Sequence, residues 1–272
     1  MPNWKKLTER IERLLRLKDF PIAFKLLEDK DDLNKNPWVR ISKTKQTLCQ
    51  YITKVRTHDW TVGVTEENLA TPICAYMLGF IEKPQLVKTG TYRAIKWFKN
   101  IEEAKKFEET FPTLPFSKYK ALIMAPLIYN PFDPDIILIY ANPAQMIVLI
   151  NALQYEDYKV MEMYCVGESS CSDVIARCFK NKRPQISIPC YGERRYGGLQ
   201  DDELAIAIPA DMYEKAVNGL EELYKKGIRY PIPFYGAEID PTPGLFDAYG
   251  GKSHARKVQK KIEREKSSKS KN

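Results

Sequence analysis

Twenty consecutive residues, Ile136 to Tyr155, carry no charged side chain. One helix of this length would be long enough to cross a membrane. Asn142 and Pro143 interrupt the stretch, however, and predict a buried strand over 136–140, a sharp turn, and a helix over 143–153 that begins at the proline. A buried strand followed by a helix is typical of a sheet covered by helices, so we expect no membrane span.

Strand and helix patterns alternate along the rest of the chain. Further strands are predicted over 21–27, 60–65, 91–98, 120–127, 158–164, 185–188 and 204–208. Helices are predicted over 4–18, after a cap at Ser42, and over 67–80, 102–110, 172–179 and 211–226. Short connections suit antiparallel neighbours. We therefore predict an α/β or α+β fold with a mixed sheet, in one globular domain over 1–250 that ends in a proline-rich arm over 230–250.

The net charge of +8 comes almost entirely from the last 22 residues, 251–272, which contain nine Lys or Arg and two Glu. We expect this basic tail to be helical at first and disordered beyond. It is most simply a solvated tail. The alternative is a weak electrostatic contact with nucleic acid or an acidic partner, which rising salt would abolish. No base-reading or base-stacking motif accompanies it.

Cellular location follows from the N-terminus and from the cysteine content. The N-terminal residues mix charged with apolar side chains and lack the apolar core and cleavage site of a signal peptide. Six cysteines in 272 residues are too few for a disulfide-stabilised secreted scaffold. We expect a cytoplasmic protein with reduced thiols.

The cysteines contain no close pair of the kind found in common zinc and ferredoxin-like sites. Cys171 is expected at the start of a helix, where the helix dipole lowers a thiol pKa, so it is the better candidate for a reactive or ligating thiolate. Cys165 and Cys178 are expected to be buried packing residues. Only two histidines are present, which disfavours a histidine metal site.

The sharpest local motif is CYGERRYGG, residues 190–198, which we call the arginine motif. The motif predicts a glycine-rich loop between two strands, and its glycines would let a ligand approach the backbone closely. Arg194 and Arg195 offer fork-shaped donors for a carboxylate or phosphate, with Tyr196 beside them. The alternative is a surface turn in which the glutamate of the motif pairs with an arginine. Lys25, the one charge inside strand 21–27, could extend an anion pocket.

Several segments together resemble domain-of-unknown-function family 169, an uncharacterised group of prokaryotic proteins. These segments are PIAFK, YKALIMAPL, DIILIYANPAQ, CSDVIA and CYGERRYGGLQDDELAIAIP. The resemblance spans about 21–223, and the last segment is its most specific part. It implies a single cytoplasmic domain and no assigned reaction.

The resemblance also implies a set of cysteines. Members carry residues equivalent to Cys49, Cys171 and Cys190, and a further cysteine in a Cys-Pro step. This chain has Thr71-Pro72 at the corresponding step and Cys74 one turn further along. The implied site therefore holds either four thiolates, with Cys74 as the substitute, or three, which would leave one iron of a four-iron cluster open to a substrate.

Three functions remain open at this point. The first is an iron–sulfur protein, or less favourably a zinc protein, in which the arginine motif and Lys25 bind an anionic small molecule for redox or Lewis-acid chemistry. The second is a metal-free binding protein, an accessory or a sensor, that holds a small anion. The third is a thiol redox protein that uses Cys171 and Cys190.

Overall fold

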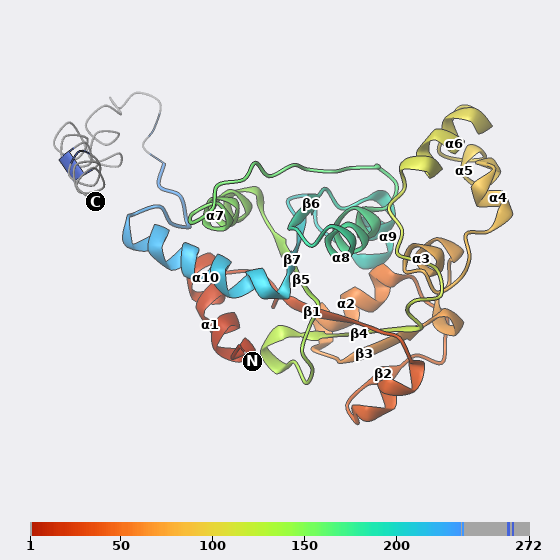
Figure 1. Ribbon diagram of the computed structural model, residues 1–272, viewed down its shortest axis with the longest axis horizontal. Helices are drawn as coiled ribbons and strands as arrows, with labels where there is room; N and C mark the ends of the chain where they lie inside the picture. The colour runs from red at the N-terminus through yellow and green to blue at the C-terminus, as the bar shows by residue number, and fades with distance from the viewer. Residues whose placement is uncertain (1, 235, 237–259, 262, 264–272) are drawn as a thin grey trace, which may run out of the picture. The chain divides into compact units, whose positions relative to one another are not determined.

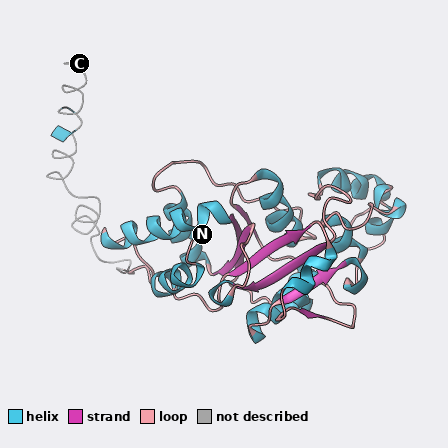
Figure 2. Ribbon diagram, turned by 60° about the horizontal axis from the view of Figure 1, so that its bottom comes forward, coloured by secondary structure: helices cyan, strands magenta, loops and turns pink. Residues whose placement is uncertain are grey.

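The structure is a computed structural model that describes residues 2–234, 236, 260–261 and 263. The chain divides into one compact unit, Met1–Tyr230, and a second unit, Pro231–Asn272. The first unit contains a mixed sheet with helices on both faces (Figures 1 and 2), which confirms the predicted fold class. In the second unit residues 260, 261 and 263 are helical. Most of the predicted arm and tail, 237–259 and 264–272, lies outside the described residues.

The sheet of the first unit has the strand order β2-β3-β4-β1-β5-β7-β6. Its strands are β1 (Ile22–Leu27), β2 (Arg40–Ile41), β3 (Val62–Thr65), β4 (Ala121–Pro126), β5 (Ile136–Ala141), β6 (Gln185–Ser187) and β7 (Leu204–Pro209). Neighbours are antiparallel except for the parallel pair of β2 and β3. β4 and β5 are buried along their whole length. Helices cover both faces of these strands, which explains their unbroken apolar sequences.

The first helix precedes the first strand, the last helix follows the last strand, and the others lie in the connections between strands. The helices are α1 (Trp4–Leu15), α2 (Leu48–His58), α3 (Pro72–Met77), α4 (Gln85–Lys88), α5 (Thr91–Ala94), α6 (Ile101–Thr110), α7 (Pro143–Leu153), α8 (Arg177–Asn181), α9 (Tyr191–Gly197) and α10 (Ala210–Lys225). The shorter segments are η1 (Lys30–Lys35), η2 (Glu66–Asn68), η3 (Leu127–Tyr129) and the π-helical η4 (Ser172–Ala176). No helix among the described residues is long and apolar enough to cross a membrane.

Alternate positions along the strands form two large cores, and a smaller third cluster consists of Leu27, Leu33, Ala121 and Ile123. Phe24 of β1 and Met124 of β4 point to the face covered by α2, α3 and η4, which we call the α2 face. Ala23 of β1 and Ile137 of β5 point to the face covered by α1, α7 and α10. Figure 1 shows α1 beside α10 on this second side. The period of two that separates the faces is the normal consequence of strand geometry.

The strand, turn and helix predicted from the charge-free stretch are confirmed. Asn142 caps α7: its side chain accepts a hydrogen bond from the Gln145 backbone at 2.9 Å, and the Gln145 side chain accepts one from the Asn142 backbone at 2.8 Å. This reciprocal pair satisfies two backbone donors that the start of a helix leaves without partners. Pro143 occupies the first helical position, where its missing N–H costs nothing.

The strand predicted over 91–98 is wrong, because these residues form α5 and a following turn. The alternation of polar and apolar residues suggested that the hydrophobic side chains would be buried. In the structure Ile95 is 83% exposed, whereas Arg93 is only 1% exposed. Arg93 is buried because it forms ion pairs with Glu108 and Glu168. The charged residue of the pattern, rather than the apolar one, faces inward.

Three other local predictions are also corrected. Residues 158–164 form only an isolated bridge, at Met163, and Tyr158 and Val160 remain exposed. The helix predicted over 67–80 is divided into η2 and α3, since Pro72 starts a new helix behind a cap at Thr71. Thr47 rather than Ser42 caps α2, because Thr47 and Gln50 form a capping box.

Glu12 gives this fold a predictable pH dependence. Burial, with a smaller contribution from Asp19, raises the pKa of Glu12 from 4.5 to about 7. The stabilisation linked to its protonated form is complete below the unfolded value of 4.5 and is lost as pH rises to about 7. Discounted for partial exposure, the loss is about 1–2 kcal/mol. We expect the free energy of unfolding, measured with urea, to vary less with pH between pH 5 and pH 8 in Glu12→Gln than in the parent protein. An unchanged pH dependence would contradict this assignment.

Candidate functional site

Four of the six cysteines line one cavity on the α2 face of the sheet. The cavity has a volume of about 510 Å³. Cys49 lies on α2 and Cys74 lies on α3. Cys171 is the residue that precedes η4, and Cys190 is the N-cap residue of α9. The other lining residues are Thr47, Thr71, Ile73, Met77, Tyr92, Ile95, Lys96, Trp97, Glu168, Ser169, Tyr191, Gly192, Arg195 and Tyr196. The tertiary fold therefore brings together side chains that are far apart in the sequence.

The two remaining cysteines lie elsewhere. Cys178 is fully buried in the core of the α2 face, as expected. Cys165 is exposed, which corrects its prediction as a buried packing residue. It follows the isolated bridge at Met163, in a segment that forms no regular strand against the core. Substitutions of these two cysteines can therefore serve as controls for substitutions of the cavity cysteines.

Three of the four cavity thiols, those of Cys74, Cys171 and Cys190, have raised pKa values. Burial raises the pKa of Cys74 to about 11 and also raises the pKa of Cys190. Hydrogen bonding to Cys49, followed by burial, raises the pKa of Cys171 well above its ordinary value. The sequence predicted a lowered pKa for Cys171 from a helix N-terminus. That expectation is wrong, because removal from water and a neighbouring thiol outweigh the helix dipole.

Glycine at position 197 lets α9 pack directly on α2. A Cβ atom at this position would lie 3.2 Å from the Cβ of Cys49 and 3.1 Å from Leu199 Cδ2. Thr53 of α2 donates a hydrogen bond from its hydroxyl to the Gly197 carbonyl at 2.7 Å. This close contact fixes Cys49 relative to α9, which carries Cys190 at its N-cap.

The arginine motif, predicted as a glycine-rich loop, is the helix α9. Gly198 ends it in the left-handed conformation, with φ +67°, so this glycine serves as a helix C-cap. Glu193 of the motif does not pair with an arginine at the surface. It is buried and accepts hydrogen bonds from the hydroxyls of Tyr140 and Ser170. The loop prediction failed because a buried glutamate anchors one side of this segment.

Ser170 connects Glu193 to the cysteines. Its hydroxyl oxygen also accepts a hydrogen bond from the Cys190 backbone at 3.0 Å. Burial raises the pKa of Glu193, while its two hydroxyl donors lower it. Behind Tyr140, the Arg56 guanidinium lies 4.4 Å from the ring centroid. A network of buried polar side chains therefore supports the part of the cavity wall that contains Cys190.

The outer wall of the cavity comes from α5 and the turn that follows it. Arg93 donates to the Tyr76 hydroxyl at 2.7 Å and forms ion pairs with Glu108 and Glu168. Because Glu168 lines the cavity, its ion pair with Arg93 connects α5 to the part of the cavity wall that contains Glu168. Burial raises the pKa of Glu168, and the adjacent Arg93 lowers it. The network positions Tyr92, Lys96 and Trp97 at the opening.

The four residues that were predicted to bind an anion do not all lie at the same cavity. Arg195 and Tyr196 line the cavity. Arg194 lies outside its lining: its guanidinium donates to the Pro189 carbonyl at 3.2 Å and to the Gln200 carbonyl at 2.6 Å. Lys25 lies on β1, among residues that face away from the cysteines, and donates to the Asp133 carbonyl at 2.8 Å. The fold therefore brings two of the four predicted ligands to the thiols.

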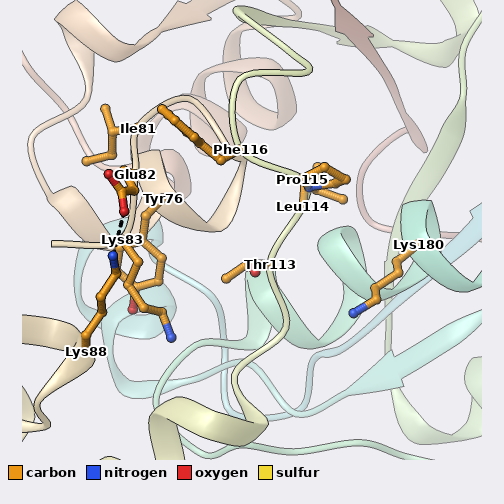
Figure 3. A pocket seen from close by; sticks show the side chains of 10 residues that line it. All are labelled: Tyr76, Ile81, Glu82, Lys83, Lys88, Thr113, Leu114, Pro115, Phe116 and Lys180. Carbon is orange, nitrogen blue, oxygen red and sulfur yellow. Dashed lines mark hydrogen bonds and ion pairs between the residues drawn. The ribbon is translucent and has the colours of Figure 1, made fainter. Parts of the chain in front are cut away.

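A second cavity, of about 420 Å³, is lined partly by lysines. Figure 3 shows Glu82 and Lys88 joined by an ion pair on one side and Lys180 of α8 on the other. Lys83 is paired with Glu108 at 2.9 Å. Two of its three lysines are thus neutralised by carboxylates. This makes it a weaker candidate for an anion than the cavity with the cysteines.

In the part of the chain that the structure describes, no set of side chains is already arranged to bind a single metal ion. No group of three or more His, Cys, Asp or Glu side chains there is arranged to hold a metal ion. The four thiols line one cavity. A tetrahedral zinc ion, with bonds to sulfur of about 2.3 Å, would require its ligands about 4 Å apart.

Comparison with known proteins decides the family. The family model described as Uncharacterised ArCR, domain-of-unknown-function family 169, matches residues 10–219. The chain belongs to this family. An uncharacterized protein of Methanocaldococcus jannaschii is 28% identical over 223 residues, which cover 80% of this chain and 92% of that protein. No solved structure matches this family member. All four cavity cysteines lie within the matched residues.

Sequence reasoning missed the aromatic and charged residues of the opening. Tyr92, Lys96 and Trp97 belong to a segment that was predicted as a strand, and Glu168 belongs to a connection without a clear pattern. Tyr191 was inside the arginine motif but was not selected. The only available signal was the density of aromatic residues over 91–98, which a strand explains equally well.

Proposed function

We propose that this protein binds an iron–sulfur cluster through Cys49, Cys171 and Cys190, with Cys74 as the fourth cysteine at the same cavity. The supporting observation is that these four thiols, from four separate segments, line one cavity while the other two cysteines lie outside it. Thiolates are the usual ligands of such clusters. Bound there, the cluster would supply redox chemistry or a Lewis-acidic iron for a small anionic substrate.

The arrangement of the thiols favours a cluster over a single zinc ion. Cysteines around a four-iron cluster each bind a different iron, so they tolerate a wider spacing than ligands of one ion. Burial raises the pKa values of Cys74 and Cys190, and a hydrogen bond with Cys49, followed by burial, raises that of Cys171. Metal binding must therefore release protons, and uptake should weaken as pH falls. Maintenance of the thiols in a reducing cytoplasm belongs to the same proposal.

The chain's own residues give three of the four thiols a defined position. Ser170 holds the backbone of Cys190, Thr71 donates its hydroxyl to the Cys74 sulfur at 3.3 Å, and Gly197 brings Cys49 against α9. Arg195 lies at the same cavity and provides a fixed positive charge for an anionic substrate. Such support around a site is what holds ligands in place for metal binding.

Metal content tests this function directly. The full chain should be purified without oxygen and measured for iron, zinc, acid-labile sulfide and visible absorption. We expect iron with matching sulfide, and we expect Cys171→Ala to lose most of both while its circular dichroism stays close to that of the parent protein. Cys178→Ala removes a buried thiol outside the cavity and should retain the metal. Equal metal content in both variants would contradict the proposed ligands.

A metal-free binding protein is the second candidate. The raised thiol pKa values favour it, because neutral thiols form an apolar floor without any metal. In that case careful anaerobic purification should yield a colourless protein that takes up no iron or sulfide on reconstitution. Its cavity would still bind a small anion, and Cys171→Ala would leave that binding unchanged.

A further inference from the structure

Four aromatic rings from two separate segments surround the opening of the thiol cavity. Tyr92 and Trp97 belong to α5 and the turn after it, and Tyr191 and Tyr196 belong to α9. Their exposed fractions are 40%, 42%, 55% and 52%. Half-exposed aromatic rings gathered at one cavity leave apolar surface in water that a ligand can cover.

The two segments meet through ring contact. The centroids of Trp97 and Tyr191 are 6.0 Å apart, with an angle of 68° between the ring planes. This edge-to-face geometry is a favourable aromatic arrangement. It connects the turn after α5 with α9 at the cavity. We call Tyr92, Trp97, Tyr191 and Tyr196 the aromatic rim.

Two cations lie beside the aromatic rim. Arg195 donates from Nη1 to the Tyr191 hydroxyl at 3.1 Å, and its guanidinium carbon lies 5.9 Å from the Tyr196 ring centroid. The Lys96 ammonium lies 5.9 Å from the Trp97 ring centroid. Among the cavity-lining residues the carboxylate is that of Glu168, which Arg93 already neutralises. The opening therefore favours a negatively charged ligand.

The inner wall differs from the opening. Ile73 and Met77 line the cavity together with the four thiols. A ligand that fits both parts has an apolar body facing inward and an anionic group near the cations. The volume of about 510 Å³ lies within the range of small-molecule sites. An aliphatic anion would leave the ring contacts unused, and a neutral aromatic molecule would leave the cations unused.

We propose that the cavity binds an aromatic or heteroaromatic anion, a flat ring that carries an acidic group. Arg195 and Lys96 bind the acidic group, and Trp97 and Tyr196 contact the ring. This inference rests on the proposed function in that it names the ligand class of the same cavity. It does not require the metal to be present, because the aromatic rim and the two cations lie on the chain itself.

A matched set of probes tests the ligand class by titration calorimetry on the full chain. The probes are 2-naphthoate, its saturated analogue decahydro-2-naphthoate, and the neutral 2-naphthamide. We expect 2-naphthoate to bind at least about tenfold more tightly than either of the others, since each control loses one of the two recognition elements. Equal affinity for all three probes, or no detectable binding of 2-naphthoate, would overturn the proposal.

Paired variants locate the binding. Trp97→Leu and Arg195→Gln should each weaken 2-naphthoate binding by about five- to tenfold. The controls are Trp38→Leu, another exposed tryptophan outside the cavity, and Arg194→Gln, the neighbouring arginine that does not line it. Both should bind 2-naphthoate normally. Loss of binding in the controls alone would place the ligand elsewhere and overturn the assignment.

The experiment also separates this inference from two other outcomes. Calorimetry on chelator-treated and on iron-reconstituted protein should give the same preference for 2-naphthoate. If no metal binds but the preference persists, the proposed function fails and the ligand class stands. If metal binds but the preference is absent, only the ligand class fails. Concentration-dependent dimerisation that Trp97→Leu abolishes would instead identify the rim as a protein interface and overturn the proposal.

Discussion

Replacing Arg93 with Met is expected to lower the free energy of unfolding by about 3–5 kcal/mol. The substitution keeps an unbranched side chain of similar reach but leaves Glu108 and Glu168 without their shared cation. Tyr76 also loses its donor from the guanidinium. Removing one partner of a buried ion pair is costly because the remaining charge stays out of water. Urea unfolding at neutral pH measures the loss.

Arg13→Met provides the matched control. Arg13 also pairs with a glutamate, Glu221, but its side chain is 71% exposed. Exposed pairs contribute about 0–1 kcal/mol, so this substitution should have little effect. The defect of Arg93→Met should shrink as pH falls, because protonation of Glu168 removes the charge that the substitution leaves unpaired. A similar loss in both variants, or a defect that grows at low pH, would contradict a buried ion pair at Arg93.

The same residue explains why the outer wall of the cavity escaped prediction. The strand pattern over 91–98 depends only on neighbouring residues, whereas the burial of Arg93 depends on Glu108 and Glu168, which are 15 and 75 positions away in the chain. Hydropathy cannot indicate that a charge will be neutralised by distant partners. Once Arg93 turns inward, Ile95 and Trp97 turn outward. The exposure of Trp97, one of the four rings of the aromatic rim, is a consequence of that inversion.

The central strands were predictable for the opposite reason. β4 and β5 are apolar at almost every position, and this property alone places them in the middle of a sheet that helices cover on both sides. The turn at Asn142 is local as well, because its capping partner Gln145 is three residues away. Elements that depend on contacts within a few residues, or on apolar content, are accessible from sequence.

The cysteine site lies between these two cases. Family resemblance indicated which cysteines belong together, but spacing along the chain contained no information about distance in space. Their common cavity depends on the packing of α9 on α2, which Gly197 permits, and on the anchoring of α9 by Glu193. Neither contact has a sequence signature, since a glycine in a charged segment is equally typical of a loop.

Glu193 is expected to be the second most sensitive position, and Glu193→Leu should lower the free energy of unfolding by about 2–4 kcal/mol. Leucine fills most of the same volume but cannot accept hydrogen bonds, so the hydroxyls of Tyr140 and Ser170 lose a buried acceptor. Ser170 then no longer has a fixed position from which to accept the backbone hydrogen bond of Cys190. The change should therefore reach the cavity as well as the core.

Two measurements separate these effects. Urea unfolding reports the loss of stability, and the rate of Cys190 alkylation in the native, metal-free protein reports the position of its thiol. We expect faster alkylation in Glu193→Leu, because Cys190 is shielded from solvent in the parent protein and its thiol pKa is raised by burial. Glu193→Gln keeps a side-chain oxygen that accepts from one hydroxyl, while the other hydroxyl can rotate to accept from the amide. That variant should lose no more than about 1 kcal/mol, and Cys190 should be alkylated more slowly in it than in Glu193→Leu. If Gln proves as damaging as Leu, the negative charge itself supports the site, and hydrogen bonding is not the reason that α9 holds Cys190 in place.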